Sequence, residues 1–140
     1  MPGYSGTPLP KKLGIKENFR TLLLNVPEEV KADLRDALGK CRMENRKGKD
    51  LDFIFLFVNS LAALTAELLP AAQALAPTGM IWIAWPKKSS GVITDLTEDV
   101  IRRDGLRAGL VDVKVCAVTE VWSGLKFVIP IKNRSKLRIH

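Results

Sequence analysis

LDFIFLFV at residues 51–58 and MIWIAW at residues 80–85 are the two runs from which the architecture of this chain can be worked out. Each is short, almost continuously apolar and rich in β-branched and aromatic residues, which is typical of a central strand covered on both faces. Residues 61–69 between them carry leucines at helical spacing, with Asn59 or Ser60 as the capping residue. A strand, a helix and a second strand predict a parallel βαβ unit, with a kink or restart of the helix at Pro70.

The residues before this unit repeat its pattern in a shorter form. RTLLLNV at residues 20–26 predicts a strand, and a helix follows from Pro27 as its first residue to a stop at Gly39. CRMEN at residues 41–45 is a weak second strand. The first dozen residues carry three prolines and two glycines, so we expect an extended arm there rather than a helix or strand.

The end of the chain changes character. A third helix, with Asp95 at its cap in a capping-box spacing with Glu98, is expected to end near Gly109. Two strand patterns at residues 111–121 and 125–131 then follow, separated by Trp122-Ser123-Gly124 as a hairpin turn. The predicted fold class is therefore α/β: a Rossmann-like, mostly parallel sheet of about five or six strands with helices on both faces and a C-terminal antiparallel hairpin.

Length and charge limit what the chain can be. Its 140 residues suit a single domain, with an N-terminal arm at 1–19, an α/β core at 20–131 and a basic tail at 132–140. The net charge is +7, and four of the last nine residues are basic, which allows contact with nucleic acid or acidic partners. No apolar run is long enough to cross a bilayer and no signal core follows the N-terminus, so we expect a cytoplasmic protein without a membrane partner.

The scarcity of two residue types excludes several kinds of chemistry. His140 is the single histidine, and Cys41 and Cys116 lie far apart without a CxxC spacing. These counts argue against Cys/His zinc sites, disulfides and Ser-His-Asp or Cys-His catalysis. We therefore predict no metal and no catalytic residue, and the sequence favours a binding domain over an enzyme.

The predicted binding site lies where parallel strands end. In open α/β sheets ligands sit at the carboxyl edge, and both the loop after residue 85 and the turn at 122–124 are expected there, side by side. Lysines supply charge to an anion, and hydroxyls and amides supply geometry. The alternative is a basic loop neutralised by the nearby acidic start of its own helix. The residues predicted to bind the anion are Lys87, Lys88, Ser89, Ser90, Gly91, Asp95, Trp122 and Ser123.

The order of elements resembles the class I methyltransferase-type Rossmann fold. LDFIFLFV, LAPTGMIWIAWP and the final hairpin are similar to its fourth to seventh strands, over roughly residues 20–131. In that family a Gly-x-Gly loop after the first strand lets the cofactor approach the backbone. Here the same place reads Asn25-Val26-Pro27-Glu28-Glu29. We therefore expect no cofactor, and specifically no binding of S-adenosylmethionine or NAD.

Three longer motifs carry a closer resemblance. GYSGTPLPKKLGIK, WPKKSSGVITDLTEDVIR and GLVDVKVCAVTEVWSGLKFV resemble a family of small bacterial proteins catalogued as domain of unknown function 3052. That resemblance assigns no catalytic role. The leading functional prediction is a non-catalytic domain that binds an anionic small molecule or acidic partner at the carboxyl edge. The alternatives are a divergent methyltransferase-like transferase using the same edge, and a nucleic-acid-associated protein acting through basic tails.

Overall fold

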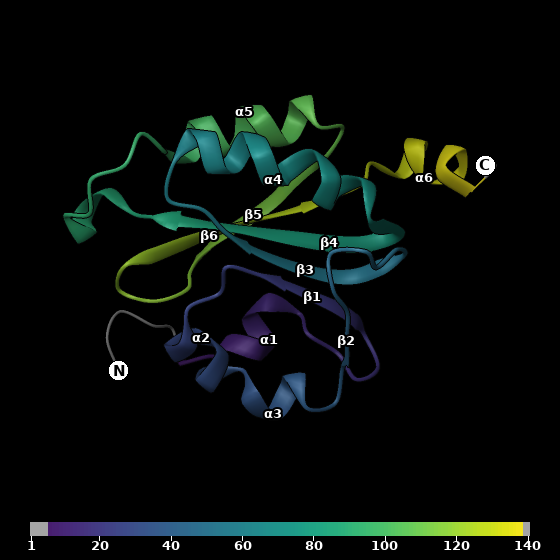
Figure 1. Ribbon diagram of the computed structural model, residues 1–140, viewed down its shortest axis with the longest axis horizontal. Coiled ribbons are helices and arrows are strands. Elements are labelled where there is room, and N and C mark those ends of the chain that lie inside the picture. Colours follow the sequence, from purple (N-terminus) through teal and green to yellow (C-terminus); the bar gives the residue numbers. More distant parts are fainter. Residues whose placement is uncertain (1–5, 139–140) are drawn as a thin grey trace.

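A six-stranded sheet forms the centre of the computed structural model, which describes residues 6–138 (Figure 1). Its strands lie in the order β2-β1-β3-β4-β6-β5. Their bounds are Arg20–Leu24 for β1, Arg42–Met43 for β2, Leu51–Phe57 for β3, Leu75–Pro86 for β4, Val111–Ala117 for β5 and Trp122–Val128 for β6.

The direction of the strands confirms the predicted fold class. β2, β1, β3 and β4 run parallel, whereas β6 is antiparallel to both β4 and β5. The sheet therefore has a parallel half and a C-terminal antiparallel half. The hairpin does not fold back outside β4 but inserts its second strand between β4 and β5, so that residues 122–128 lie beside residues 80–86.

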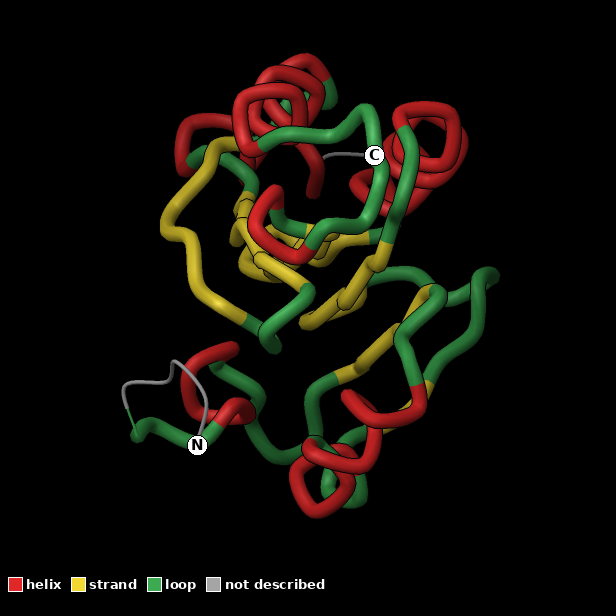
Figure 2. Tube along the Cα trace, turned by 90° about the vertical axis from the view of Figure 1, so that its left-hand side faces the viewer, coloured by secondary structure: helices red, strands yellow, loops and turns green. Residues whose placement is uncertain are grey.

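Helices cover both faces of the sheet, as Figures 1 and 2 show. The upper face carries α4 (Leu61–Gln73) and α5 (Glu98–Arg107), and the lower face carries α1 (Leu9–Leu13), α2 (Glu28–Asp33) and α3 (Arg35–Leu38). Each face has its own apolar cluster: Ile81, Ile83 and Phe127 belong to the one on which the α4 leucines pack, and Trp82 and Phe55 to the one around Leu13. Alternation along β3 and β4 thus divides one apolar run between two cores.

The prediction that the first dozen residues form an extended arm is wrong from residue 9 onward, and residues 1–5 lie outside the described residues. Residues 9–13 form α1, Leu13 is fully buried, and its carbonyl accepts a 2.9 Å hydrogen bond from the indole nitrogen of Trp82. Gly14 ends the helix at φ 82°, a left-handed conformation that suits glycine. The prolines at 8 and 10 occupy the cap and the first turn, where a missing amide donor is tolerated. This position-specific tolerance is why proline-rich composition alone misled the prediction.

Several predicted boundaries also need correction. Pro27 is the cap of α2 rather than its first helical residue, and the expected single helix breaks at Leu34 into α2 and α3. α4 runs through Pro70 without a restart. At the C-terminus, β6 ends at Val128 rather than at residue 131, and residues 131–138, which include most of the predicted basic tail, form α6 (Ile131–Arg138); residues 139–140 lie outside the described residues. No helix among residues 6–138 is long and apolar enough to cross a membrane.

Candidate functional site

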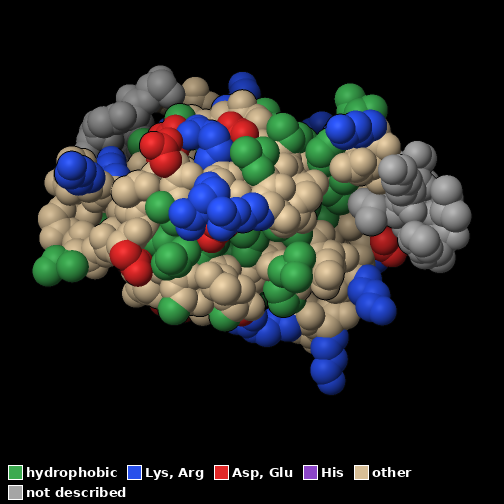
Figure 3. Space-filling model, turned by 90° about the horizontal axis from the view of Figure 1, so that it is seen from above, with side chains coloured by type: hydrophobic (Ala, Val, Ile, Leu, Met, Phe, Trp, Pro, Cys, Tyr) green, Lys and Arg blue, Asp and Glu red, His purple; other side chains and the backbone are tan. Residues whose placement is uncertain are grey.

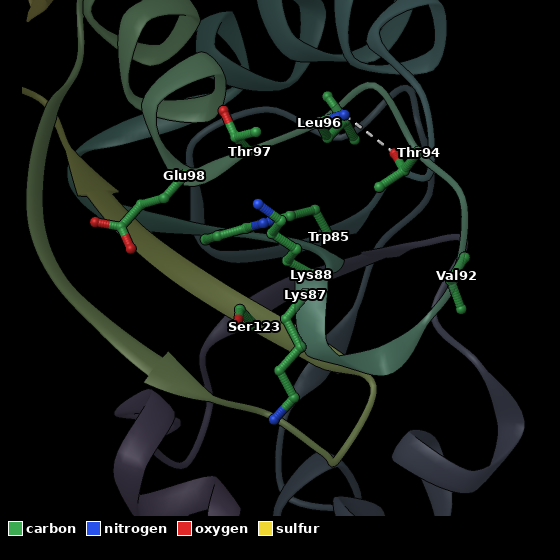
Figure 4. A pocket seen from close by; sticks show the side chains of 9 residues that line it. All are labelled: Trp85, Lys87, Lys88, Val92, Thr94, Leu96, Thr97, Glu98 and Ser123. Atoms are coloured by element: carbon green, nitrogen blue, oxygen red, sulfur yellow. Dashed lines mark hydrogen bonds between the residues drawn. The ribbon is translucent and has the colours of Figure 1, made fainter.

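A pocket of about 420 Å³ opens at the carboxyl edge of the sheet, between the end of β4 and the start of α5 (Figure 4). Trp85 and Lys88 lie at its middle, with Thr97 and Glu98 on one side and Val92 on the other, while Lys87 extends away past Ser123. The residues that line it are Trp85, Lys87, Lys88, Val92, Thr94, Leu96, Thr97, Glu98 and Ser123.

The lysine-bearing wall is held by short-range hydrogen bonds. The Lys87 amide donates to the carbonyl of Val121 at 2.8 Å, which ties the end of β4 to the turn before β6. A 3-10 turn over Lys88–Ser90 follows, and the Ser90 hydroxyl donates to the Lys87 carbonyl at 2.7 Å. Gly91 then reverses the chain at φ 79°. The backbone that carries both lysines is therefore a structured turn.

The opposite wall is fastened to the start of α4. Thr94 donates its hydroxyl to the Asn59 carbonyl at 2.8 Å, and the Asp95 carboxylate accepts from the Leu61 amide at 2.8 Å. The cap of α5 is Thr97, whose hydroxyl accepts from the Val100 amide at 3.2 Å. The prediction that Asp95 caps α5 is therefore wrong. Asp95 satisfies the first turn of α4 instead, a long-range contact that the local capping pattern did not indicate.

The carboxylates near the pocket are engaged with other groups. The Glu98 and Asp99 carboxylates lie 2.7 and 3.4 Å from the Arg102 guanidinium, and Asp112 contacts the same side chain at 3.0 Å. The hydrogen bonds that Arg102 donates to Glu98 and to Asp112, the one to Glu98 contributing most, raise the pKa of Arg102. Figure 3 shows this mixture of charges on the face covered by α4 and α5. No ion pair within residues 6–138 involves Lys87 or Lys88, so the acidic helix start does not neutralise the lysine turn by direct contact.

The structure brings together part of the predicted set. Lys87, Lys88 and Ser123 line the pocket, whereas Ser89, Ser90, Gly91 and Asp95 hold or continue the walls without lining it. Trp122 and Ser123 are the first residues of β6 rather than a turn; the turn is at residues 118–121.

The aromatic wall of the pocket is a different tryptophan from the one expected. Trp122 faces the lower core, where its ring lies 4.8 Å from that of Phe57. Pairing of Trp85 with Ser123 in the sheet places those two residues on the same, upper face. Side chains alternate between the two faces along MIWIAW, so the face of any one residue in this strand predicts that Trp85 lies on the face opposite to Trp82.

The turn after β1 does not fit S-adenosylmethionine in the mode of the glycine-loop enzymes. Asn25 adopts φ 61°, and its side-chain amide lies 3.5 Å from the Glu67 carboxylate. Arg46 holds that carboxylate at 2.6 Å, and this hydrogen bond lowers the pKa of Glu67. Pro27 at the cap of α2 offers no amide, and the acidic side chains of Glu28 and Glu29 follow it. In the glycine-loop enzymes the cofactor needs an uncovered backbone and hydrogen-bond donors at this turn. Here the turn carries a network of side chains and two carboxylates instead.

Among the described residues, neither a metal-binding cluster nor a disulfide is present. Within residues 6–138 no group of three or more His, Cys, Asp or Glu side chains is arranged to hold an ion. Cys41 and Cys116 are free and half-buried, and burial raises the pKa of Cys116 above its ordinary value.

Comparisons with known proteins agree with the fold. A family model described as a protein of unknown function, DUF3052, matches residues 14–131. No curated protein gives a significant match.

Solved structures with a similar fold include methyltransferases of low sequence identity. A TehB-like S-adenosylmethionine-dependent methyltransferase from Corynebacterium glutamicum has 10% identity and a TM-score of 0.54, over 91% of this chain and 90% of that one. The magnesium protoporphyrin IX methyltransferase of Synechocystis, solved with bound S-adenosylhomocysteine, has 8% identity and a TM-score of 0.58, over 81% and 75%. Fibrillarin from Aeropyrum pernix has 16% identity and a TM-score of 0.55, over 90% and 70%. These likenesses concern the fold alone.

Proposed function

We propose that this chain, which belongs to the DUF3052 family of proteins of unknown function, binds a small anionic molecule in the pocket between the Lys87–Gly91 turn and the start of α5. Glu98, the carboxylate that lines the pocket, is engaged with Arg102 at 2.7 Å, and on this ground the proposed role is binding without catalysis. The ligand's anionic group, a carboxylate or phosphate, meets Lys88 in the middle of the pocket, and Lys87, whose side chain extends away past Ser123, adds positive potential at the edge.

One observation carries the proposal: two adjacent lysines at the carboxyl edge have no ion pair among the described residues, although three carboxylates lie a few residues away. If the turn served only to be neutralised locally, its two lysines would form ion pairs with Asp95, Glu98 or Asp99, which all lie within twelve positions of them. Those acids contact Arg102 and the Leu61 amide instead. The charge of the turn is therefore available to a ligand.

The remaining lining residues suit an anion with an apolar body. Trp85 and Leu96 are almost fully buried at the base of the pocket, and Val92 is half exposed at its rim. Thr97 and Ser123 supply hydroxyls around them, whereas the Thr94 hydroxyl proton is used in its hydrogen bond to the Asn59 carbonyl. Ligand sites commonly combine an apolar surface with a few directed polar groups. We expect the apolar part of the ligand to lie against Trp85 and its anionic end toward the lysines.

The test compares two variants of equal charge change. Lys87→Met/Lys88→Met retains the aliphatic stems and removes both charges, while Lys47→Met/Lys49→Met does the same in the exposed β2–β3 loop. Binding of an aromatic carboxylate and of an organic phosphate is measured by titration calorimetry at low salt. We expect the first variant to lose binding by about tenfold or more per lost contact and the second to keep it. Stability should change by about 1 kcal/mol or less in both, as for exposed charges.

Two results would contradict this function. One is a wild-type protein that binds neither probe. The other is a Lys87→Met/Lys88→Met variant that loses several kcal/mol of stability, since the turn would then be structural. In either case the pocket is a surface feature of the fold.

A transferase that uses the same edge is the second candidate, favoured by the fold it shares with methyltransferases. It requires the cofactor to bind without the glycine loop. Titration with S-adenosylmethionine separates the two candidates, because the binding domain proposed above needs no cofactor.

A further inference from the structure

A second group of basic side chains lies on the lower face of the sheet, away from the pocket. Lys114 of β5 and Lys126 of β6 are direct partners in the antiparallel register. The neighbours of Lys126 along β6, Leu125 and Phe127, belong to the upper core, so Lys126 points to the lower face. Lys16, which follows α1, is near enough to Lys126 to repel it electrostatically. The strand register therefore opposes Lys114 to Lys126, and the charge of Lys16 acts on the same Lys126 side chain.

This arrangement is unfavourable when nothing is bound. Directly opposed side chains in an antiparallel pair have Cβ atoms about 5 Å apart, and like charges there destabilise the sheet. The pKa of Lys126 is lowered, first by burial and then by the charges of Lys114 and Lys16. The same face holds Lys12, whose ammonium donates to the Ala117 carbonyl at 3.1 Å and adds to the positive potential.

Among residues 6–138, no acidic side chain pairs with these three lysines. No ion pair within residues 6–138 involves Lys16, Lys114 or Lys126. Glu17, next to Lys16, contacts Lys40 at 3.7 Å, and Asp112 contacts Arg102 on the upper face. The sequence has no Asp or Glu before residue 17 or after residue 120, so neither terminus carries an acidic side chain that could reach the cluster.

We propose that Lys16, Lys114 and Lys126 form a second anion site, which takes a compact multivalent oxyanion of the phosphate or pyrophosphate class. The donors are ammonium groups on flexible stems, which act as point charges rather than as a directed fork. Such a site selects for charge density, whereas the hydroxyls of the upper pocket select for shape. It therefore prefers pyrophosphate to phosphate, and phosphate to a carboxylate. The site is independent of the upper pocket and does not rest on its function.

Titration calorimetry with pyrophosphate at low salt tests the proposal on the full chain. The decisive variant is Lys114→Met/Lys126→Met, and Lys47→Met/Lys49→Met, which lies outside both proposed sites, is the control of equal charge change. We expect a stoichiometric signal that survives in this control and falls by about tenfold or more in the lower-face variant. The Lys87→Met/Lys88→Met variant measures separately what the upper pocket contributes. Loss in the Lys87→Met/Lys88→Met variant alone would assign the anion to the upper pocket and overturn the second site.

Thermal unfolding without ligand gives a second readout and shows that the variant folds. Removing the opposed charges should leave the melting temperature of Lys114→Met/Lys126→Met equal to or above that of the wild type. Pyrophosphate should raise the melting temperature of the wild type by more than it raises that of the variant. A variant that binds pyrophosphate as tightly as the wild type overturns the proposal. So does a wild-type protein that does not bind it.

A fluorescent single-stranded oligonucleotide in the same assay distinguishes a compact anion from a nucleic acid. Three lysines predict a shallow salt dependence, with about three ions released. An oligonucleotide that binds with a much steeper dependence and displaces pyrophosphate would assign the surface to nucleic acid and overturn the compact-anion site. Free pyrophosphate and a nucleotide of equal charge are compared next: equal affinity supports recognition of the phosphate group alone.

Discussion

Replacing Gly105 by alanine should destabilise the protein, although alanine is the better helix former. A Cβ built at Gly105 would lie 2.5 Å from Cζ and 2.8 Å from Cδ2 of Phe127, where ordinary contact begins at 3.4 Å. The helix or the ring must therefore move by about 1 Å, and the ring is fully buried. Overpacking of this kind lowers the free energy of unfolding by up to about 3 kcal/mol. The higher helix propensity of alanine raises it by about 1 kcal/mol, so the expected net loss of stability is about 2 kcal/mol.

Thermal unfolding followed by circular dichroism measures this loss. For a chain of this length we expect the melting temperature to fall by about 6–10 °C. Gly39→Ala is the matched control: its backbone is right-handed helical, and the added Cβ meets its nearest backbone oxygens at 3.4 and 3.5 Å. Phe127→Leu in the Gly105→Ala background should recover part of the stability. A Gly105→Ala protein as stable as the Gly39→Ala control would refute the close approach of α5 to β6.

Two further predictions concern cofactors and the C-terminus. Neither S-adenosylmethionine nor NAD should give a micromolar stoichiometric signal by calorimetry, because Asn25–Glu29 replaces the glycine loop; such a signal would revive the transferase reading. Deletion of residues 132–140 should lower stability by about 1 kcal/mol or less, since Lys132 is exposed and Arg134 donates a local hydrogen bond to the Ile129 carbonyl, five residues earlier. A large fall in melting temperature on this truncation would show that α6 belongs to the core.

The candidate site was predictable in part, and the reason lies in strand register. The sequence placed the PKKSSG turn at the carboxyl edge correctly, because an apolar strand followed by a capped helix must turn there. The sequence pattern indicates the wrong tryptophan, because it predicts a hairpin turn at residues 122–124, where the structure has the first residues of β6. Once β6 begins at Trp122, its pairing with Pro86 sends the ring of Trp122 to the lower core and leaves Trp85 at the pocket.

The sequence by itself determined the features that depend on neighbours along the chain. Continuous apolar runs identified the central strands, Ser60 capped α4 as expected, and the alternation of strands and helices predicted a parallel sheet with a final hairpin. Such patterns act through local backbone sterics and side-chain periodicity, and they keep their meaning without the rest of the fold.

Tertiary structure alone decided which distant groups meet. Asp95 accepts from the amide of Leu61, 34 positions away, although its spacing from Glu98 imitates a cap for α5. Lys114 faces Lys126 only because β6 lies between β4 and β5 in a register shifted by a bulge. α1 forms because Leu13 is buried against Trp82, 69 positions away. Burial and pairing across the sheet outweigh local preference at these positions, because each contact joins segments that the chain sequence does not hold together.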